Sequence, residues 1–352
     1  MNSNPQVSIV AACRNESLNI RAFLESVLKQ EMAGIEWEAV IADGMSNDGT
    51  REFLLDTCRQ HPQLHLIDNP GLIVSTGLNR AIRMARGEII VRMDAHTKYA
   101  PDYVRRCLEA LQQTGADNVG GPARTKARGA RARAIAAAFH SKFSTGGGKF
   151  HDENFEGWVD TVPYGCWRKS TLDELGLFDE SLVRNQDDEL NLRLRRAGGR
   201  IWQTPKIVSW YSPRATLASL FQQYFQYGFW KVAVIRKHRL PGSWRHLVPC
   251  AFVASNLLLG AILAAAAASE FGAAANWAAL AWLGLILCYC AATLVASLAA
   301  AACAGWVVLA YLPAAFLAYH AGYGLGFLVG IVTIRRGRAA GWNGLLVTRI
   351  TR

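Results

Sequence analysis

The sequence lacks the features of a disulfide-bonded, zinc-binding or secreted protein. Its eight cysteines show no paired CxxC spacing, and four of them lie in an apolar region, so neither a disulfide framework nor a zinc site is indicated. No charged segment precedes the first apolar run, which begins at Val7 and is typical of a strand rather than of a signal peptide. We therefore expect the N-terminal part to stay in the reducing cytoplasm.

Charge is nearly missing from a long C-terminal region. Between Leu247 and Ile334 the only formally charged residue is Glu270, and Ala, Leu, Val and Gly dominate. A stretch of this length without charge cannot face water, so it predicts membrane-spanning helices. It divides into about three apolar segments, which are Leu247–Ala268, Asn276–Ala299 and Gly305–Val332.

The formal net charge of +11 is concentrated beside this apolar region. The flanking basic residues are Arg236, Lys237, Arg239 and Arg245 before it and Arg335, Arg336 and Arg338 after it. Positive charge beside membrane segments marks the cytoplasmic face, and no nucleic-acid motif accompanies it, so we expect a multi-pass inner-membrane protein and no nucleic-acid partner. Two cytoplasmic flanks require an even number of crossings, whereas three segments give an odd one. The number of crossings stays open.

The N-terminal half alternates strand and helix patterns. Strands are predicted at Val7–Ala12, Glu38–Ala42, Leu64–Ile67 and Glu88–Met93, and a helix at Gly77–Ala85. This alternation predicts an α/β domain with a parallel sheet, whose ligands lie at the carboxyl ends of the strands. The expected segments are a catalytic domain (1–211), interfacial amphipathic helices (212–246), transmembrane helices (247–334) and a basic tail (335–352).

Polar residues follow two of these strands. Asp43 ends the second strand and begins a turn with Gly44, where a carboxylate can accept hydrogen bonds from a nucleotide base, although such turns are common without a ligand. Asp94 and His96 follow the fourth strand, and residues two apart at a strand end can reach one divalent ion. Carboxylate, imidazole and diphosphate oxygens together suit Mn²⁺ somewhat better than Mg²⁺.

A third polar cluster, Gln186-Asp187-Asp188-Glu189, opens an amphipathic segment. Acidic residues in the first turn stabilise a helix in any protein. An Asp held at a helix start can also act as a general base toward an acceptor hydroxyl, and direct attack with one such base inverts the anomeric configuration. Both readings remain open.

Taken together and in this order, the motifs resemble glycosyltransferase family 2, over about Val7 to Lys231. The segment VDTVPYGCWRKSTLDELGLFDESLVRNQDDELNLRLRRAGGRIW is similar to the succinoglycan-biosynthesis ExoA-type subfamily. The resemblance implies a GT-A (Rossmann-like) nucleotide-sugar-binding domain followed by a C-terminal helical transmembrane region. It also implies a UDP-sugar donor, expected to be UDP-glucose, and a polyprenyl-diphosphate-linked saccharide acceptor in exopolysaccharide biosynthesis.

The same resemblance assigns roles to individual positions. The donor-binding positions are Ala11, Arg14, Glu16, Asp43, Gly44 and Asp94; the metal positions are Asp94 and His96; the catalytic base is Asp187; and the acceptor-side positions are Gly165, Cys166, Gln186, Asp188, Gln226 and Trp230.

Three positions depart from the family pattern. His96 replaces a metal-binding Asp, Gln186 replaces a Glu before the base (so that Asp188 rivals Asp187), and Phe229 replaces the Arg of a QxxRW signature. The last change favours single additions over repeated polymerisation. Two alternatives stay open: a polyprenyl-phosphate sugar synthase of the same fold, and a catalytically inactive membrane-bound sugar-nucleotide-binding protein. A sugar-nucleotidyltransferase is disfavoured because the Gly-rich N-terminal loop with its Lys is absent.

Overall fold

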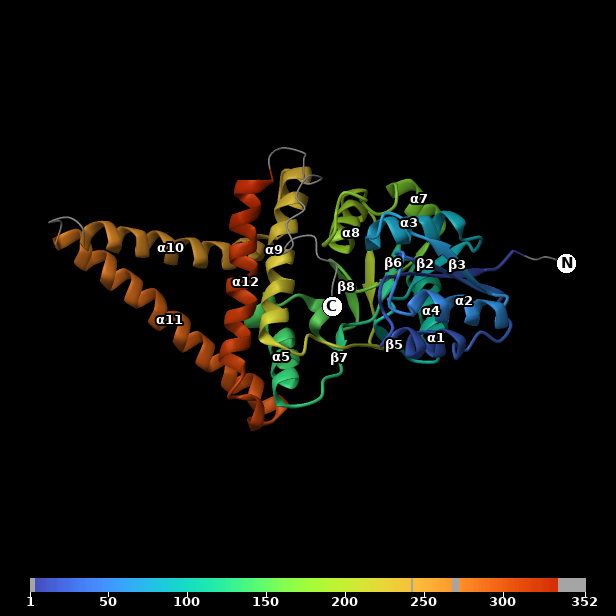
Figure 1. Cartoon of the computed structure of the whole chain (residues 1–352), viewed down its shortest axis with the longest axis horizontal. Helices are drawn as coiled ribbons and strands as arrows, with labels where there is room; N and C mark the ends of the chain where they lie inside the picture. The colour runs from blue at the N-terminus through green and yellow to red at the C-terminus, as the bar shows by residue number, and fades with distance from the viewer. Residues whose placement is uncertain (1–3, 242, 268–271, 335–352) are drawn as a thin grey trace. The chain divides into compact units, whose positions relative to one another are not determined.

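The computed structural model describes residues 4–241, 243–267 and 272–334, and the chain divides into two compact units (Figure 1). The α/β unit comprises Met1–Lys126 and Gly148–Ser212, and the helical unit comprises Ala127–Gly147 and Pro213–Arg352. Residues 127–147, expected within the catalytic domain, therefore group with the C-terminal helices instead. Glu270 and the basic tail lie outside the described residues.

In the described part of the chain, the α/β unit contains a mixed sheet of eight strands. In spatial order they are β3 (Leu64–Asp68), β2 (Trp37–Asp43), β1 (Val7–Cys13), β4 (Ile89–Arg92), β9 (Cys166–Arg168), β6 (Asn118–Gly120), β10 (Ile201–Gln203) and β8 (Gly157–Val159). The first four are parallel, as the sequence predicts, but β9 runs antiparallel to β4 and β6, and β8 antiparallel to β10. The predicted parallel sheet is confirmed for β1 to β4, whereas β8 and β9 run antiparallel to their neighbours.

A second sheet of three short strands completes the strands of this unit among the described residues. Its order is β5 (Thr97–Tyr99), β11 (Ser209–Tyr211) and β7 (Arg124–Thr125). Because β5 begins directly after the Asp94–His96 turn, the small sheet fixes where that turn lies relative to β4.

Helices cover both faces of the main sheet. On one face lie α1 (Ile20–Leu28), α2 (Thr50–Gln60) and α4 (Tyr103–Thr114); on the other lie α3 (Val74–Met84), α7 (Lys169–Leu175) and α8 (Gln186–Arg196). Alternate residues of β1 supply the two cores, since Ile9 packs with α1 and Val10 packs with α3. The result is a three-layer α/β arrangement with its strand ends free to carry a site.

The helical unit consists, among the described residues, of α5 (Ala130–His140), α6 (Lys142–Thr145), α9 (Leu217–His238), α10 (Val248–Ala267), α11 (Gly272–Ala304), α12 (Leu312–Thr333) and short 3₁₀ turns. Its core joins residues of α5, α9, α11 and α12. Three described helices are long and apolar enough to cross a membrane, at Trp244–Ala266, Ala275–Ala304 and Leu312–Thr333.

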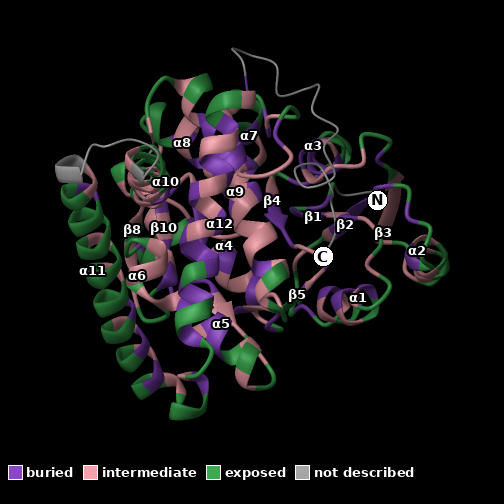
Figure 2. Cartoon of the chain, turned by 60° about the vertical axis from the view of Figure 1, so that its left-hand side comes forward, coloured by how far each residue is buried: buried purple, intermediate pink, exposed green. Residues whose placement is uncertain are grey.

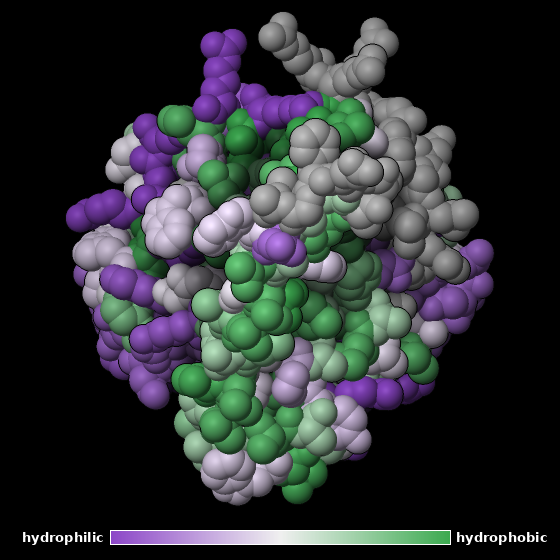
Figure 3. Space-filling view, turned by 90° about the vertical axis from the view of Figure 1, so that its left-hand side faces the viewer, coloured by the Kyte–Doolittle hydropathy of each residue, from purple (hydrophilic) through white to green (hydrophobic). Residues whose placement is uncertain are grey.

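The surfaces of these three helices differ. Most side chains of α10 and α11 are exposed, whereas most of α12 is covered by other helices of the unit (Figure 2). Hydrophobic side chains gather on the face that α10 and α11 present (Figure 3). An apolar surface of this extent is stable only against lipid or another apolar partner.

Candidate active site

The candidate site lies where β2, β1 and β4 end side by side. In the sheet register Cys13 of β1 pairs with Asp43 of β2, and Val10 of β1 pairs with Arg92 of β4. Neighbouring strands are about 4.8 Å apart, so groups that follow β2 and β4 lie about 10 Å from each other across β1. A nucleotide diphosphate can span this separation.

Arg92, the last residue of β4, joins two of the predicted site residues. Its Nε and Nη2 donate hydrogen bonds to the two carboxylate oxygens of Asp94 at 2.7 and 3.0 Å, and its Nη1 donates to Asp187 in the first turn of α8. Arg92 and Asp187 are 95 residues apart in the sequence. The predicted metal ligand and the predicted base are therefore held by one guanidinium group.

The pKa values in this cluster are determined by burial and by the attraction between Arg92 and the two carboxylates. Burial alone would lower the pKa of Arg92, but the carboxylates of Asp187 and Asp94 outweigh it and hold that pKa above its usual value. Burial raises the pKa of Asp187; Arg92 opposes this shift, while Asp94 and Asp188 add to it. The side chain of Asp187 nevertheless stays 37% exposed, so an acceptor can reach a carboxylate that is surrounded by protein on its other sides.

Arg92 is a functional candidate that the sequence reasoning missed. Its side chain is only 3% exposed, inside a strand that otherwise reads as apolar. A buried arginine requires a carboxylate partner. The sequence therefore indicated Arg92 as a charged residue in an apolar strand, but it did not show that the partner of Arg92 is Asp187 in α8.

His96 and Glu16 approach each other beside this cluster. His96 Nδ1 lies 3.6 Å from Glu16 Oε1, and the two side chains are 27% and 12% exposed. The His96 ring also packs edge-on against Tyr211. His96 therefore faces a polar surface rather than the protein core.

These residues fit a divalent ion that is held jointly with a substrate. Among the described residues no three His, Cys, Asp or Glu side chains are close enough to hold a metal by themselves. One or two protein ligands with substrate phosphate oxygens is, however, a usual arrangement for Mg²⁺ or Mn²⁺. The carboxylate of Asp94 accepts hydrogen bonds from Arg92 at both oxygens, and carboxylate oxygens and an imidazole nitrogen are suitable ligands for such an ion, so Asp94 and His96 could supply the protein ligands.

Asp43 organises a loop from a buried position. Its carboxylate accepts hydrogen bonds from Ser46 N and Oγ at 3.1 and 2.5 Å and from Arg51 Nη1 at 3.1 Å, and Asp43 is fully buried. In this arrangement Asp43 shapes the turn that follows β2. Direct contact between Asp43 and a base requires this turn to open, and it stays a prediction.

The loops after β1 and β2 are tied together by four hydrogen bonds. These are Asn15 N to Ser46 Oγ, Asn47 N to Asn15 Oδ1, Ser17 N to Asp48 Oδ2 and Glu16 N to Thr50 Oγ1, at 2.8 to 3.0 Å. The hydroxyl of Thr50 and the backbone of Ser17 help to lower the pKa of Asp48 to about 2, against the opposing effect of its burial. The two loops thus form one rigid rim at the strand ends.

Arg14 lies on this rim, directly above Gly44. A Cβ atom at Gly44 would come 3.0 Å from the Arg14 side chain, so a larger residue there would have to displace that side chain slightly. Arg14 is half-buried and forms no ion pair with any described residue. Ala11, by contrast, lies inside β1 and is buried, ahead of the loop that begins after Cys13, and its contact with the donor stays a prediction.

The predicted acceptor-side residues divide into two groups. Gly165 has a φ of +102°, and its carbonyl accepts a hydrogen bond from Arg92 N at 3.1 Å. Cys166 is fully buried in β9, and Gln186 is buried at the start of α8 beside Asp187 and the half-buried Asp188. These residues are thus neighbours of the cluster.

Gln226 and Trp230 form the second group. They lie in α9 of the helical unit, where both are buried. Their acceptor role stays a prediction.

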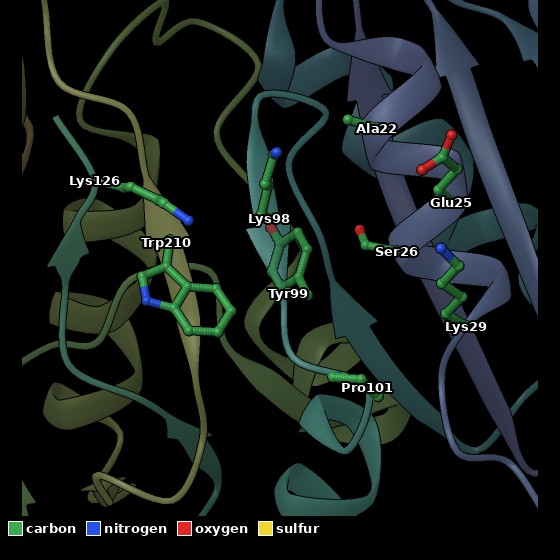
Figure 4. A pocket seen from close by; sticks show the side chains of 9 residues that line it. All are labelled: Ala22, Glu25, Ser26, Lys29, Lys98, Tyr99, Pro101, Lys126 and Trp210. Atoms are coloured by element: carbon green, nitrogen blue, oxygen red, sulfur yellow. The ribbon is translucent and has the colours of Figure 1, made fainter. Parts of the chain in front are cut away.

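The basic stretch that begins at Arg124 does not form a single surface. Arg124 forms an ion pair with Glu153 at 3.5 Å, whereas Arg131 donates to a backbone carbonyl of the helical unit. Lys126 lines a hollow of about 250 Å³ together with residues of α1, β5 and β11, and none of the predicted site residues line it (Figure 4). The basic residues of this stretch therefore make different contacts from one residue to the next.

The fold and the strand-end cluster define a GT-A glycosyltransferase, and comparison with known proteins identifies its family. The family model described as Glycosyl transferase family 2 matches residues 8–168. The succinoglycan biosynthesis protein ExoA of Rhizobium meliloti (strain 1021) is 36% identical over 258 residues, which cover 73% of this chain and 77% of that protein. The chain belongs to glycosyltransferase family 2 and is an ExoA-type glycosyltransferase.

Two further proteins are similar over most of the chain. A dolichyl N-acetyl-alpha-D-glucosaminyl phosphate 3-beta-D-2,3-diacetamido-2,3-dideoxy-beta-D-glucuronosyltransferase of Methanococcus voltae is 27% identical over 70% of this chain and 78% of its own. The mannosyltransferase PcManGT from Pyrobaculum calidifontis, solved in complex with GDP-Man and Mn²⁺, superposes with a TM-score of 0.55 and 21% identity, over 92% of this chain and 88% of its own. The similarity to PcManGT supports the assignment of the GT-A fold.

Proposed function

We propose that this glycosyltransferase is an inverting, metal-dependent enzyme that transfers glucose from UDP-glucose to a polyprenyl-diphosphate-linked saccharide in exopolysaccharide biosynthesis. The observation that carries the proposal is the Arg92 cluster, which holds Asp94 and Asp187 at one edge of the sheet. In this proposal Asp94 serves the donor, and Asp187, whose side chain is 37% exposed, serves the acceptor.

Asp187 is the proposed base. The acceptor hydroxyl oxygen attacks the anomeric carbon of the donor while Asp187 accepts the hydroxyl proton. The bond between the anomeric carbon and the diphosphate oxygen breaks, and its electron pair leaves with UDP. One direct displacement inverts the anomeric configuration.

The remaining residues bind and orient the donor. Arg14, which forms no ion pair with a described residue, is the proposed cation for the diphosphate, and the rim formed by the β1 and β2 loops faces the nucleotide. Asp94 and His96 are the proposed ligands of Mn²⁺ or Mg²⁺, which supplies Lewis-acid stabilisation of the leaving diphosphate. Arg92 is a positioning residue, because it touches the two carboxylates rather than the reacting atoms.

The lipid-linked acceptor and the cytoplasmic inner-membrane location rest on separate observations. Three described helices are apolar and long enough to cross a membrane, and basic residues stand before the first of them. The name of the Methanococcus voltae relative includes a dolichyl-linked sugar phosphate. A saccharide on a polyprenyl carrier is consistent with the apolar helices and with the acceptor named for this relative.

The test is turnover of the purified full chain with a panel of UDP- and GDP-sugars on lipid-linked acceptors, with Mn²⁺ or with EDTA. We expect UDP-glucose to be used, EDTA to stop the reaction, and the product to have the opposite anomeric configuration from the donor. Turnover of a GDP-sugar instead would refute the proposed donor. Near-normal turnover of Asp187→Asn would indicate a polyprenyl phosphate acceptor, which needs no base.

A further inference from the structure

The three apolar helices differ in how far protein covers them. In their most hydrophobic windows, 11% of α10 and 17% of α11 are buried, against 56% of α12. We propose that only α10 and α11 cross the bilayer, and that α12 lies beside α9 at the membrane surface from which α10 enters. The lipid bilayer is therefore the partner of the α10–α11 hairpin alone.

Helix α12 packs so closely on α9 that the two helices must lie at the same depth. Three glycines spaced four residues apart on α12 touch backbone carbonyls spaced four apart on α9: Gly322 on Phe221, Gly326 on Phe225 and Gly330 on Phe229. A Cβ atom on Gly326 would lie 2.0 Å from the Phe225 carbonyl oxygen. Because both residue numbers rise together, the helices run parallel and in contact over most of their lengths. A crossing by α12 would carry α9 through the bilayer with it.

Helix α9 is a poor membrane-spanning helix. Three glutamines and Lys231 lie within its central turns, and it is absent from the described helices that are apolar enough to cross. Gln226 and Lys231 are 3% and 6% exposed, so they are accommodated by protein contacts. Ionisable and amide side chains at membrane depth are disfavoured, which places the α9–α12 pair outside the hydrocarbon core.

Helices α5 and α6 are hydrogen-bonded to α12 partway along its length. His320 Nε2 lies 2.9 Å from the carbonyl oxygen of Phe143 in the one-turn helix α6, and Tyr319 Oη donates to the Ile135 carbonyl oxygen at 3.2 Å. His320 is eight residues after Leu312, which is about 12 Å along a helix. A crossing α12 would draw α6 with its exposed Lys142 to that depth, where lipid-exposed irregular backbone does not occur.

The ends of α11 and α12 lead to the same conclusion. Arg133 donates to the carbonyl oxygen of Ala304 at the end of α11, and Arg236 donates to that of Ile331 near the end of α12, at 2.5 and 2.6 Å. The C-terminal ends of α11 and α12 thus both lie beside arginines, which favour the cytoplasmic side. Two crossings, rather than three, reconcile this pattern with the charge rule.

The length of α11 is consistent with this arrangement. Its 33 residues exceed what the hydrocarbon core requires, which is about 20. Ser297 and Ala301 near its C-terminal end are fully buried, and Ala301 belongs to the protein core of the helical unit. The preceding part of α11 is long enough to cross, so its last turns need not enter lipid.

The experiment places an epitope tag at one of two positions in the full-length chain. One tag follows Arg352, and the other is inserted at Glu270, between α10 and α11 in the sequence. Protease is added to spheroplasts, which expose the outer face, and to inverted vesicles, which expose the cytoplasmic face. We expect the C-terminal tag to be lost only in inverted vesicles and the Glu270 tag only in spheroplasts.

Two results would overturn the proposal. Loss of the C-terminal tag in spheroplasts shows that α12 crosses. Protection of the Glu270 tag in spheroplasts shows that the α10–α11 hairpin does not reach the outer face. If the insertion unfolds the chain, labelling of Glu270→Cys by a membrane-impermeant maleimide replaces it, with the unsubstituted chain as the control for native cysteines. The readout is topology, so it is independent of whether the proposed transfer occurs.

Discussion

Replacing Arg92 by methionine removes the cation that joins the proposed metal ligand to the proposed base. Arg92 donates two hydrogen bonds to Asp94 and one to Asp187, and methionine of similar length keeps the strand packed without any of them. Three consequences follow: lower stability, slower turnover and a displaced pH profile.

The size of the effect follows from the exposure of the two carboxylates. Removing one partner of a buried ion pair costs about 3–5 kcal/mol. The side chains of Asp94 and Asp187 are 15% and 37% exposed, so solvent compensates part of the loss, and we expect about 2–3 kcal/mol. If the same loss falls on the transition state, turnover slows by about 30- to 150-fold.

The pH dependence has a definite sign. Burial raises the pKa of Asp187 and Arg92 lowers it, so Arg92→Met raises that pKa further. A general base acts only when ionised, so the acidic limb of the kcat–pH profile moves to higher pH, and alkaline conditions restore part of the activity. The assay is the kcat–pH profile of the purified variant beside its thermal unfolding.

The matched control is Arg193→Met. Arg193 forms an ion pair with the buried Glu189 at 2.8 Å within α8 and makes no hydrogen bond or ion pair with Asp94 or Asp187. It should lower the unfolding temperature while leaving the acidic limb in place. An unchanged limb and near-normal turnover in Arg92→Met would refute the reasoning.

The remaining predictions concern the base, the metal and the helix pair. Asp187→Asn should lower kcat by about 10²- to 10⁴-fold, whereas Asp188→Asn should keep most activity; equal losses in steady-state turnover would make the base assignment wrong. His96→Asp should keep activity and shift its preference from Mn²⁺ toward Mg²⁺, as metal titrations of turnover can show; an unchanged preference argues against ligation. Gly326→Ala should destabilise the protein by about 1–3 kcal/mol in thermal unfolding because its Cβ meets a backbone carbonyl, and Gly284→Ala, with open space around it, should not.

The central strands could be predicted because local patterns determine them. The run from Val7 and the run before Asp94 are apolar and end in turn residues, and both strands formed within about a residue of the predicted ends. The strands β6 to β11 contain only two or three residues, too few for a period to show. Their pairing depends on tertiary contacts, so the antiparallel insertion of β9 was not predicted.

The site was predictable as a set of residues and only partly as an arrangement. The position of Asp94 after a strand follows from local sequence, but its link to Asp187 depends on a long-range contact through Arg92. Asp43 was expected to face a ligand, yet the structure buries it under Ser46 and Arg51. The sequence gives the chemical type of each residue, whereas the burial of a residue such as Asp43 depends on contacts with the rest of the fold.

The segment 127–147 shows a different limit. Its arginines form a basic stretch, but its alanine-rich face, with Ile135, packs against the C-terminal helices. The residues that it packs against lie in α9, α11 and α12, far along the chain. No local pattern links the two.

The most direct test of the central claim is the binding of UDP, with and without Mn²⁺, to Asp94→Asn and Asp187→Asn in calorimetric titrations. We predict that Asp94→Asn loses about tenfold or more of the Mn²⁺-dependent affinity, while Asp187→Asn binds UDP normally but does not turn over. Unchanged Mn²⁺-dependent binding by Asp94→Asn would contradict a shared site for donor and base.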